Sequence, residues 1–154
     1  MMIAKEVNSL KMIEYIKCAW SGDDNLPLFY DSSLSHKSFK GMVYDTHLKI
    51  LDMYEKDTNL KLIGIDYDDQ MVGFIVLSER FNCLYSFGVK QDFRKEEVLK
   101  PLFFYITNKL KDGFFCMLNE YNTRAIKWLK KCGMVQKEYP ANEKIVYLKY
   151  EKCQ

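Results

Sequence analysis

The sequence lacks the features that mark several large protein classes. No apolar stretch approaches the roughly 20 residues of a membrane-spanning helix, and residues 1–7 lack the long apolar run of a signal peptide. The 154 residues include only 3 prolines and 7 glycines, without a repeat, a low-complexity tract or an interdomain linker. These absences predict one domain over residues 1–154, located in the cytoplasm and without a membrane partner.

Patterns for metal binding and for disulfides are missing as well. His36 and His47 have no cysteine at the spacing of a zinc site, so no metal is expected. The five cysteines form no C-x-x-C pair, and their odd number and irregular spacing indicate reduced thiols. They are Cys18, Cys83, Cys116, Cys132 and Cys153.

The sequence has no large excess of basic over acidic residues. The 23 basic residues are nearly balanced by 21 acidic ones, which gives a formal net charge of +2. A protein that binds nucleic acid usually shows a stronger or more segregated basic surplus. A nucleic-acid-binding module is therefore the weakest of three hypotheses for function. Neither a P-loop nor a G-x-S-x-G elbow is present.

The residues that are present predict a packed α/β (α+β) domain. Hydrophobic residues make up 48% of the chain and aromatic residues 15%, enough for a sizeable core. Apolar residues recur at helical spacing in some segments and in short strand-like runs in others. The expected order is strand 3–7, helix 10–20, a helix over 42–54, strands 61–67, 71–77 and 83–89, helix 98–110, strand 114–118, helix 123–131 and strands 134–139 and 145–150.

Segment 122–134 carries the best evidence for a family. Its asparagine, Ala-Ile pair, lysine and final glycine resemble the N-x-x-A-I-x-[FL]-[YL]-x-K-x-G-F segment of the GCN5-related N-acetyltransferases. The resemblance implies a mixed, mostly antiparallel sheet of about six to seven strands flanked by four helices. Strands four and five would run parallel and splay apart near Val89 and Asn119. Asn122 and Trp128 would lie beside the pantetheine arm of acetyl-CoA.

Segment 87–94 resembles the end of the family's fourth strand, V-x-P-x-[YF]-R. The resemblance implies that Phe87, Gly88 and Val89 contact pantetheine, largely through main-chain atoms. Gly88 has a second interpretation, because a glycine in a strand often marks a bulge or a close backbone approach.

The next residues depart from the family. After its arginine the family reads R-G-x-G-[IL]-G, and those glycines bring amides against the diphosphate. Here Lys95, Glu97 and Leu99 replace the three glycines. If acetyl-CoA binds, Arg94 and Lys95 would contact its diphosphate instead. Pro101 also predicts a later helix start than in the family, because proline is tolerated in a helix's first turn.

The family's usual catalytic acid is missing from this chain. The family's usual tyrosine acid corresponds to Leu129, which cannot donate a proton. Asn119 and Tyr121, near the end of the fifth strand, are the candidate catalytic residues, with an ordinary loop role as the alternative for each. Glu79 and Glu120 are candidate bases acting through water, or simply solvated charges.

Two functions of different class follow. The first is transfer of an acetyl group from acetyl-CoA to an amine on a small molecule or a protein. The second is a catalytically inactive binding or structural protein with the same fold, part of a protein assembly and encoded by a phage or carried in a virion. Fold alone does not decide between them.

Overall fold

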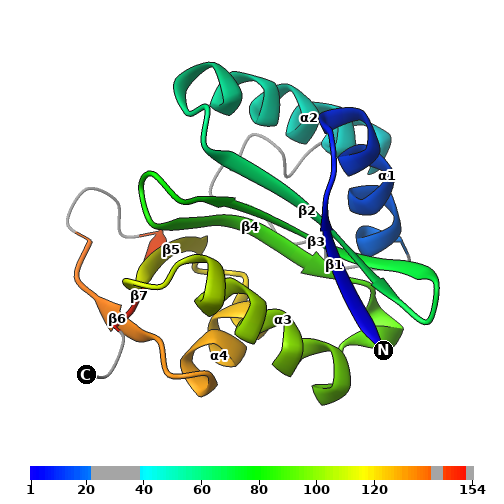
Figure 1. Cartoon of the computed structure of the whole chain (residues 1–154). Helices are drawn as coiled ribbons and strands as arrows, with labels where there is room; N and C mark the ends of the chain where they lie inside the picture. Colours follow the sequence, from blue (N-terminus) through cyan, green and yellow to red (C-terminus); the bar gives the residue numbers. More distant parts are fainter. Residues whose placement is uncertain (22–38, 140–143, 152–154) are drawn as a thin grey trace.

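The chain folds into one seven-stranded sheet with helices on both faces (Figure 1). This computed structural model describes residues 1–21, 39–139 and 144–151, with only the backbone of residues 39–44. Residues 26–40, whose serine-rich sequence predicts an irregular loop, lie almost wholly outside the described residues. None of the described helices is both long and apolar enough to cross a membrane.

The order of elements predicted from the sequence is confirmed. Each expected helix and strand is present, and most bounds agree to within two residues. The elements are β1 (Met2–Glu6), α1 (Ser9–Trp20), α2 (Phe39–Lys56), β2 (Leu60–Tyr67), β3 (Gln70–Ser78), β4 (Cys83–Val89), the 3-10 helix η2 (Gln91–Phe93), α3 (Glu96–Lys109), β5 (Phe114–Asn119), α4 (Thr123–Lys131), β6 (Val135–Lys137) and β7 (Ile145–Tyr150).

The sheet order is β1-β2-β3-β4-β5-β7-β6, and its neighbours are antiparallel except for β4 and β5. Helices α1 and α2 lie on one face, and α3 and α4 lie on the other (Figure 1). Each face has its own core. Phe74 and Val76 of β3 point toward α1, whereas Ile75 and Leu77 point into the core beneath α3. This alternation from Phe74 to Leu77 explains why the strand is buried on both faces.

Local backbone signals fix the connections around the core. Asp68 and Asp69 have positive φ angles of 49° and 65°, so they close the β2–β3 hairpin as a two-residue turn. Asn8 caps α1 by accepting a hydrogen bond from the Lys11 amide at 2.8 Å. Gly133, with φ of 105°, ends α4 as expected.

The prediction of a late start for α3 is wrong. The helix begins at Glu96, and Pro101 lies inside it. The Lys95 carbonyl accepts the first helical bonds, from the amides of Val98 and Leu99 at 3.0 and 2.9 Å. Proline removes only the bond to the Glu97 carbonyl, and Glu97 is exposed, so water can satisfy that oxygen.

The central pair of strands separates after a short contact. β4 and β5 are parallel, and their register holds only Cys83 with Phe115 and Leu84 with Cys116. Beyond these pairs β5 continues along β7 and β4 continues along β3. The predicted parallel, splayed arrangement is confirmed, and the separation begins before Val89 and Asn119.

Candidate functional site

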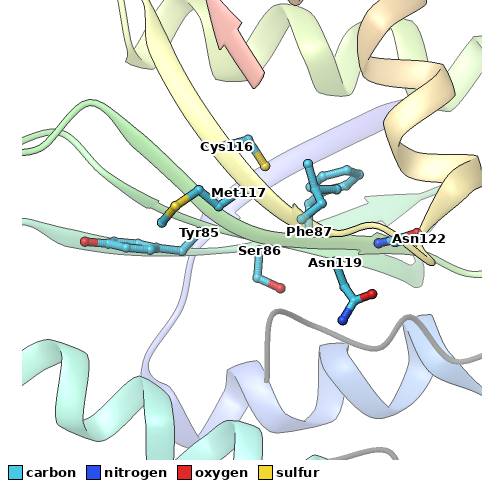
Figure 2. A pocket seen from close by; sticks show the side chains of 8 residues that line it. Tyr85, Ser86, Phe87, Cys116, Met117, Asn119 and Asn122 are labelled. Atoms are coloured by element: carbon cyan, nitrogen blue, oxygen red, sulfur yellow. The ribbon is translucent and has the colours of Figure 1, made fainter. Parts of the chain in front are cut away.

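A slot opens where β4 and β5 part. One wall comes from β4, the other from β5, and the start of α4 closes one end (Figure 2). The side chains that line it carry no formal charge at neutral pH. They belong to Tyr85, Ser86, Phe87, Cys116, Met117, Leu118, Asn119 and Asn122.

A bulge in β4 shapes the first wall. Leu84 pairs with Leu77 and Ser86 pairs with Val76, which leaves Tyr85 as an extra residue. Val76 and Tyr85 both belong to the core on the α1 face, so Tyr85 and Ser86 lie in succession on that face. Phe87 then returns to the α3 face. The bulge thus turns the Ser86 hydroxyl to the α1 face of the slot, whereas simple alternation would have turned it to the α3 face.

Asn119 and Tyr121, the two predicted catalytic residues, have different surroundings. Asn119 is 6% exposed and lines the slot from the end of β5. Its Oδ1 accepts a hydrogen bond from the Tyr121 main-chain amide at 3.0 Å. The Tyr121 side chain is 66% exposed and is not among the lining residues. A catalytic role for Tyr121 stays a prediction, and Glu79 and Glu120 are likewise exposed.

Asn122 and Trp128 of the family-like segment flank the slot. Asn122 stands at the N-cap position of α4, yet its side chain makes no capping hydrogen bond and lines the slot instead. The Trp128 ring packs against Phe87 with a centroid distance of 5.4 Å. Phe103 of α3 lies against Trp128 at 6.0 Å. Of these rings Phe87 lines the slot, and Trp128 and Phe103 pack behind it.

The end of β4 is held rigidly. The Phe74 ring lies over Gly88, where a Cβ would come within 2.7 Å of the Phe74 Cε1 atom. The group that approaches Gly88 is therefore a side-chain ring, whereas the interpretation from the sequence is a bulge or a close backbone approach. Arg94 folds back so that its Nε donates to the Val89 carbonyl at 2.9 Å. Arg94 thus ties the turn after β4 to the strand, whatever else it contacts.

The three residues at the family's glycine positions serve the start of α3. The Lys95 ammonium lies over the rings of Tyr67 and Phe93, 5.1 and 5.7 Å from their centroids. Glu97 is exposed in the first turn, and Leu99 packs against the core. Acidic residues in a first turn stabilise a helix by about 0.3–1 kcal/mol each. The sequence here favours helix formation over close approach of an anion.

No thiolate is available in the slot at neutral pH. Cys116 lines the slot, and Cys83 lies at the start of β4, both of them buried. Burial raises the pKa of Cys83 to about 12, and burial together with the nearby Cys83 raises the pKa of Cys116 well above its usual value. Because the thiolate is the reactive form, both remain unreactive apolar groups. Among the described residues no cluster of His, Cys, Asp and Glu could hold a metal.

This burial predicts a labelling pattern. In native protein at pH 7.5, iodoacetamide should modify the partly exposed Cys18 and Cys132 and spare Cys83 and Cys116. In denaturant without reductant, all five cysteines should react, including Cys153, which lies outside the described residues. Mass spectrometry of digested protein would count the sites. Native labelling of Cys116 as fast as that of Cys18 would contradict the assignment.

Neither a protein-family model nor a curated protein matches this chain, whereas solved structures match its fold. PaiA N-acetyltransferase from Thermoplasma acidophilum, solved in complex with coenzyme A, has a TM-score of 0.70 at 12% identity, over 99% of each chain. An acetyltransferase from Thermus thermophilus has a TM-score of 0.71 at 10% identity, over 99% of this chain and 97% of the other. N-acetyltransferase PseH from Campylobacter jejuni, in complex with acetyl coenzyme A, has a TM-score of 0.59 at 15% identity, over 99% of this chain and 100% of the other. At such identities the likeness concerns the fold, and this chain has the fold of the GCN5-related N-acetyltransferases.

Proposed function

We propose that the protein transfers an acetyl group from acetyl-CoA to an amine. The observation that carries this proposal is the slot formed where the parallel strands β4 and β5 separate. Two of the similar structures were solved with coenzyme A or acetyl coenzyme A. Transfer needs a site that holds the thioester and admits the amine to it from another direction.

The slot fits the pantetheine arm in chemical terms. From Ser86 to Val89, β4 pairs with β3 along one edge, and its strand pairing with β5 has already ended. On that second edge the main-chain N–H and C=O groups have no strand partner among the described residues, and the two amides of pantetheine can hydrogen-bond to such groups. Phe87 and Trp128 offer an apolar surface for the arm's methylene groups.

The diphosphate end fits less closely. The start of α3 offers main-chain N–H groups and the positive end of the helix dipole, and Arg94 and Lys95 add positive charge. Glu96 and Glu97 oppose an anion at the same place. We therefore propose that Arg94 and Lys95 contact the diphosphate in place of glycine amides.

The proposal specifies the chemical class of the acceptor, an amine. On the α1 face, Ser86 and Asn119 are the polar side chains that reach the slot beside Tyr85. We propose that Asn119, rather than Tyr121, touches a reacting group, because Asn119 lines the slot and Tyr121 does not.

A second candidate function is supported by the contacts that side chains make at the start of α3. There Lys95 contacts two aromatic rings and Leu99 packs on the core, as expected of a protein that keeps the fold without the cofactor. Such a protein would bind a protein assembly. The idea of a phage or virion origin stays a prediction.

Addition of acetyl-CoA tests the two functions. An acetyltransferase should show saturable binding in calorimetry, and its melting temperature should rise by roughly 5–10 °C at a ligand concentration 100 times the Kd. Release of the CoA thiol with a panel of small amines and peptides would then identify the acceptor. An unchanged melting temperature at millimolar acetyl-CoA would contradict the proposed transferase and support the binding protein.

A further inference from the structure

Within the part of the chain that the structure describes, the Ser86 hydroxyl is buried in the slot without a hydrogen-bond partner. A buried hydroxyl that makes no hydrogen bond is unfavourable, and such groups in a folded protein usually meet water or a ligand. The β4 bulge holds Ser86 on the α1 face, where its cross-strand neighbour is the apolar Val76. The hydroxyl therefore has a fixed position and an unused capacity to donate.

Asn119 supplies a second donor on the same face. Leu118 packs in the core beneath α3, so Asn119, the next residue of β5, points the opposite way. Figure 2 shows Ser86 and Asn119 projecting to one side of the sheet while Phe87 and Cys116 project to the other. The Tyr121 amide fixes the Asn119 carbonyl oxygen by its 3.0 Å hydrogen bond, which orients Nδ2 as the free end of the amide.

Two donors that line one slot from the same face of the sheet are suited to one acceptor oxygen. Asn119 Nδ2 can only donate, and the Ser86 hydroxyl has a proton to give. An attacking amine needs an acceptor or a base, and Nδ2 is neither, so an amine could use only the Ser86 hydroxyl, which also has lone pairs. A carbonyl oxygen has two lone pairs, and it gains negative charge during acyl transfer.

We propose that Ser86 Oγ and Asn119 Nδ2 together donate hydrogen bonds to the carbonyl oxygen of the acetyl thioester, an inference that rests on the proposed acetyltransferase function. In the reaction the amine nitrogen bonds to the carbonyl carbon, and the π electron pair moves onto the oxygen that these two groups hold. The pair then returns, the C–S bond breaks, and the sulfur leaves with its electrons. The nitrogen loses a proton to solvent and the sulfur gains one from solvent.

Carbon-13 NMR of bound acetyl-CoA labelled at the carbonyl carbon tests this directly, without turnover. In the wild-type complex the carbonyl resonance should move downfield of the free thioester, because hydrogen bonds withdraw electrons from the carbon. Ser86→Ala should return the resonance about halfway while leaving the Kd for acetyl-CoA within about threefold. Ser86→Thr, which keeps the hydroxyl, should restore the shift. Asn119→Asp keeps an oxygen for the Tyr121 amide but removes the donor, so it should also lose the shift.

Activity and stability give independent readouts. With the best amine of the panel, Ser86→Ala should lower kcat about a hundredfold, the usual effect of removing one donor to a developing oxyanion. Its melting temperature without ligand should be no lower than that of the wild type, because the hydroxyl has no partner to lose. Equal carbonyl resonances in the wild-type and Ser86→Ala complexes would overturn this inference and leave the proposed function standing. Failure of the wild type to bind acetyl-CoA would overturn both.

Discussion

Replacement of Gly64 by alanine is expected to lower the free energy of unfolding by roughly 3 kcal/mol. Gly64 lies inside β2, paired with Lys5 of β1 and Phe74 of β3. The Tyr15 ring of α1 covers it so closely that a Cβ would lie 2.5 Å from both Cε2 and Cζ of that ring. Contacts this short do not occur, so either the helix or the strand would have to move.

Tyr15 cannot move aside without further loss. Its side chain is fully buried, and its hydroxyl donates to Asp66 Oδ1 at 2.9 Å. Asp66 in turn pairs with the Lys5 ammonium at 3.0 Å. A shift of the ring would break this chain of contacts and disturb the packing of α1 on the sheet.

Thermal and denaturant unfolding would measure the effect, with an expected fall in melting temperature of roughly 6–12 °C. Gly133→Ala is a matched control with a different cause of strain. There the nearest atom to a new Cβ is 3.8 Å away, and only the positive φ of 105° opposes alanine. Its cost should be about 1 kcal/mol. Equal losses from the two substitutions would contradict the steric explanation.

The architecture could be predicted because its signals are local. The change from helical spacing to short apolar runs, the Asp68-Asp69 turn and the glycine after α4 each specify backbone conformation within a few residues. The parallel β4–β5 pair followed from the helix between them, since parallel neighbours need a crossover connection.

The polar lining of the slot could not be predicted in the same way. The run 83–89 reads as an ordinary strand, and nothing in it shows that Tyr85 and Ser86 share a face. A bulge depends on the register with the neighbouring strand, which is a tertiary property. The only sequence signal for it is the unbroken apolar series at 83–85, which departs from alternation. The start of α3 was misjudged for a related reason, because Pro101 is tolerated where one exposed carbonyl can turn to water.

Replacement of Glu97 by glycine should tighten the binding of acetyl-CoA about tenfold, or about 1.4 kcal/mol. Glu97 is exposed in the first turn of α3, at a position where the family has glycine beside the diphosphate. Its carboxylate repels phosphate, and at about 4 Å such a pair of charges interacts by about 1–4 kcal/mol near a protein surface. Glycine would also let the main chain approach the anion more closely. Calorimetry would give both dissociation constants.

The same substitution should weaken the fold when no ligand is present. Loss of a negative charge near a helix start costs about 0.3–1 kcal/mol, and glycine in a helix costs roughly 0.5–1 kcal/mol more. Glu97→Gly should therefore melt at a lower temperature than the wild type and gain more from saturating acetyl-CoA. Glu97→Gln separates the two causes, because it removes the charge but keeps a good helix former.

Neighbouring substitutions show whether position 97 is special. Glu96→Gly removes the same charge one residue earlier, at a position where the family has no glycine, so it should tighten binding by less. Arg94→Ala should weaken binding, because it removes a positive charge and frees the Val89 carbonyl that the Arg94 Nε holds at 2.9 Å. Identical affinities of wild type, Glu97→Gly and Arg94→Ala would mean that the diphosphate does not contact the start of α3. If neither the wild type nor Glu97→Gly binds acetyl-CoA, the binding-protein function becomes the better explanation, because a glycine at position 97 would then not have restored acetyl-CoA binding.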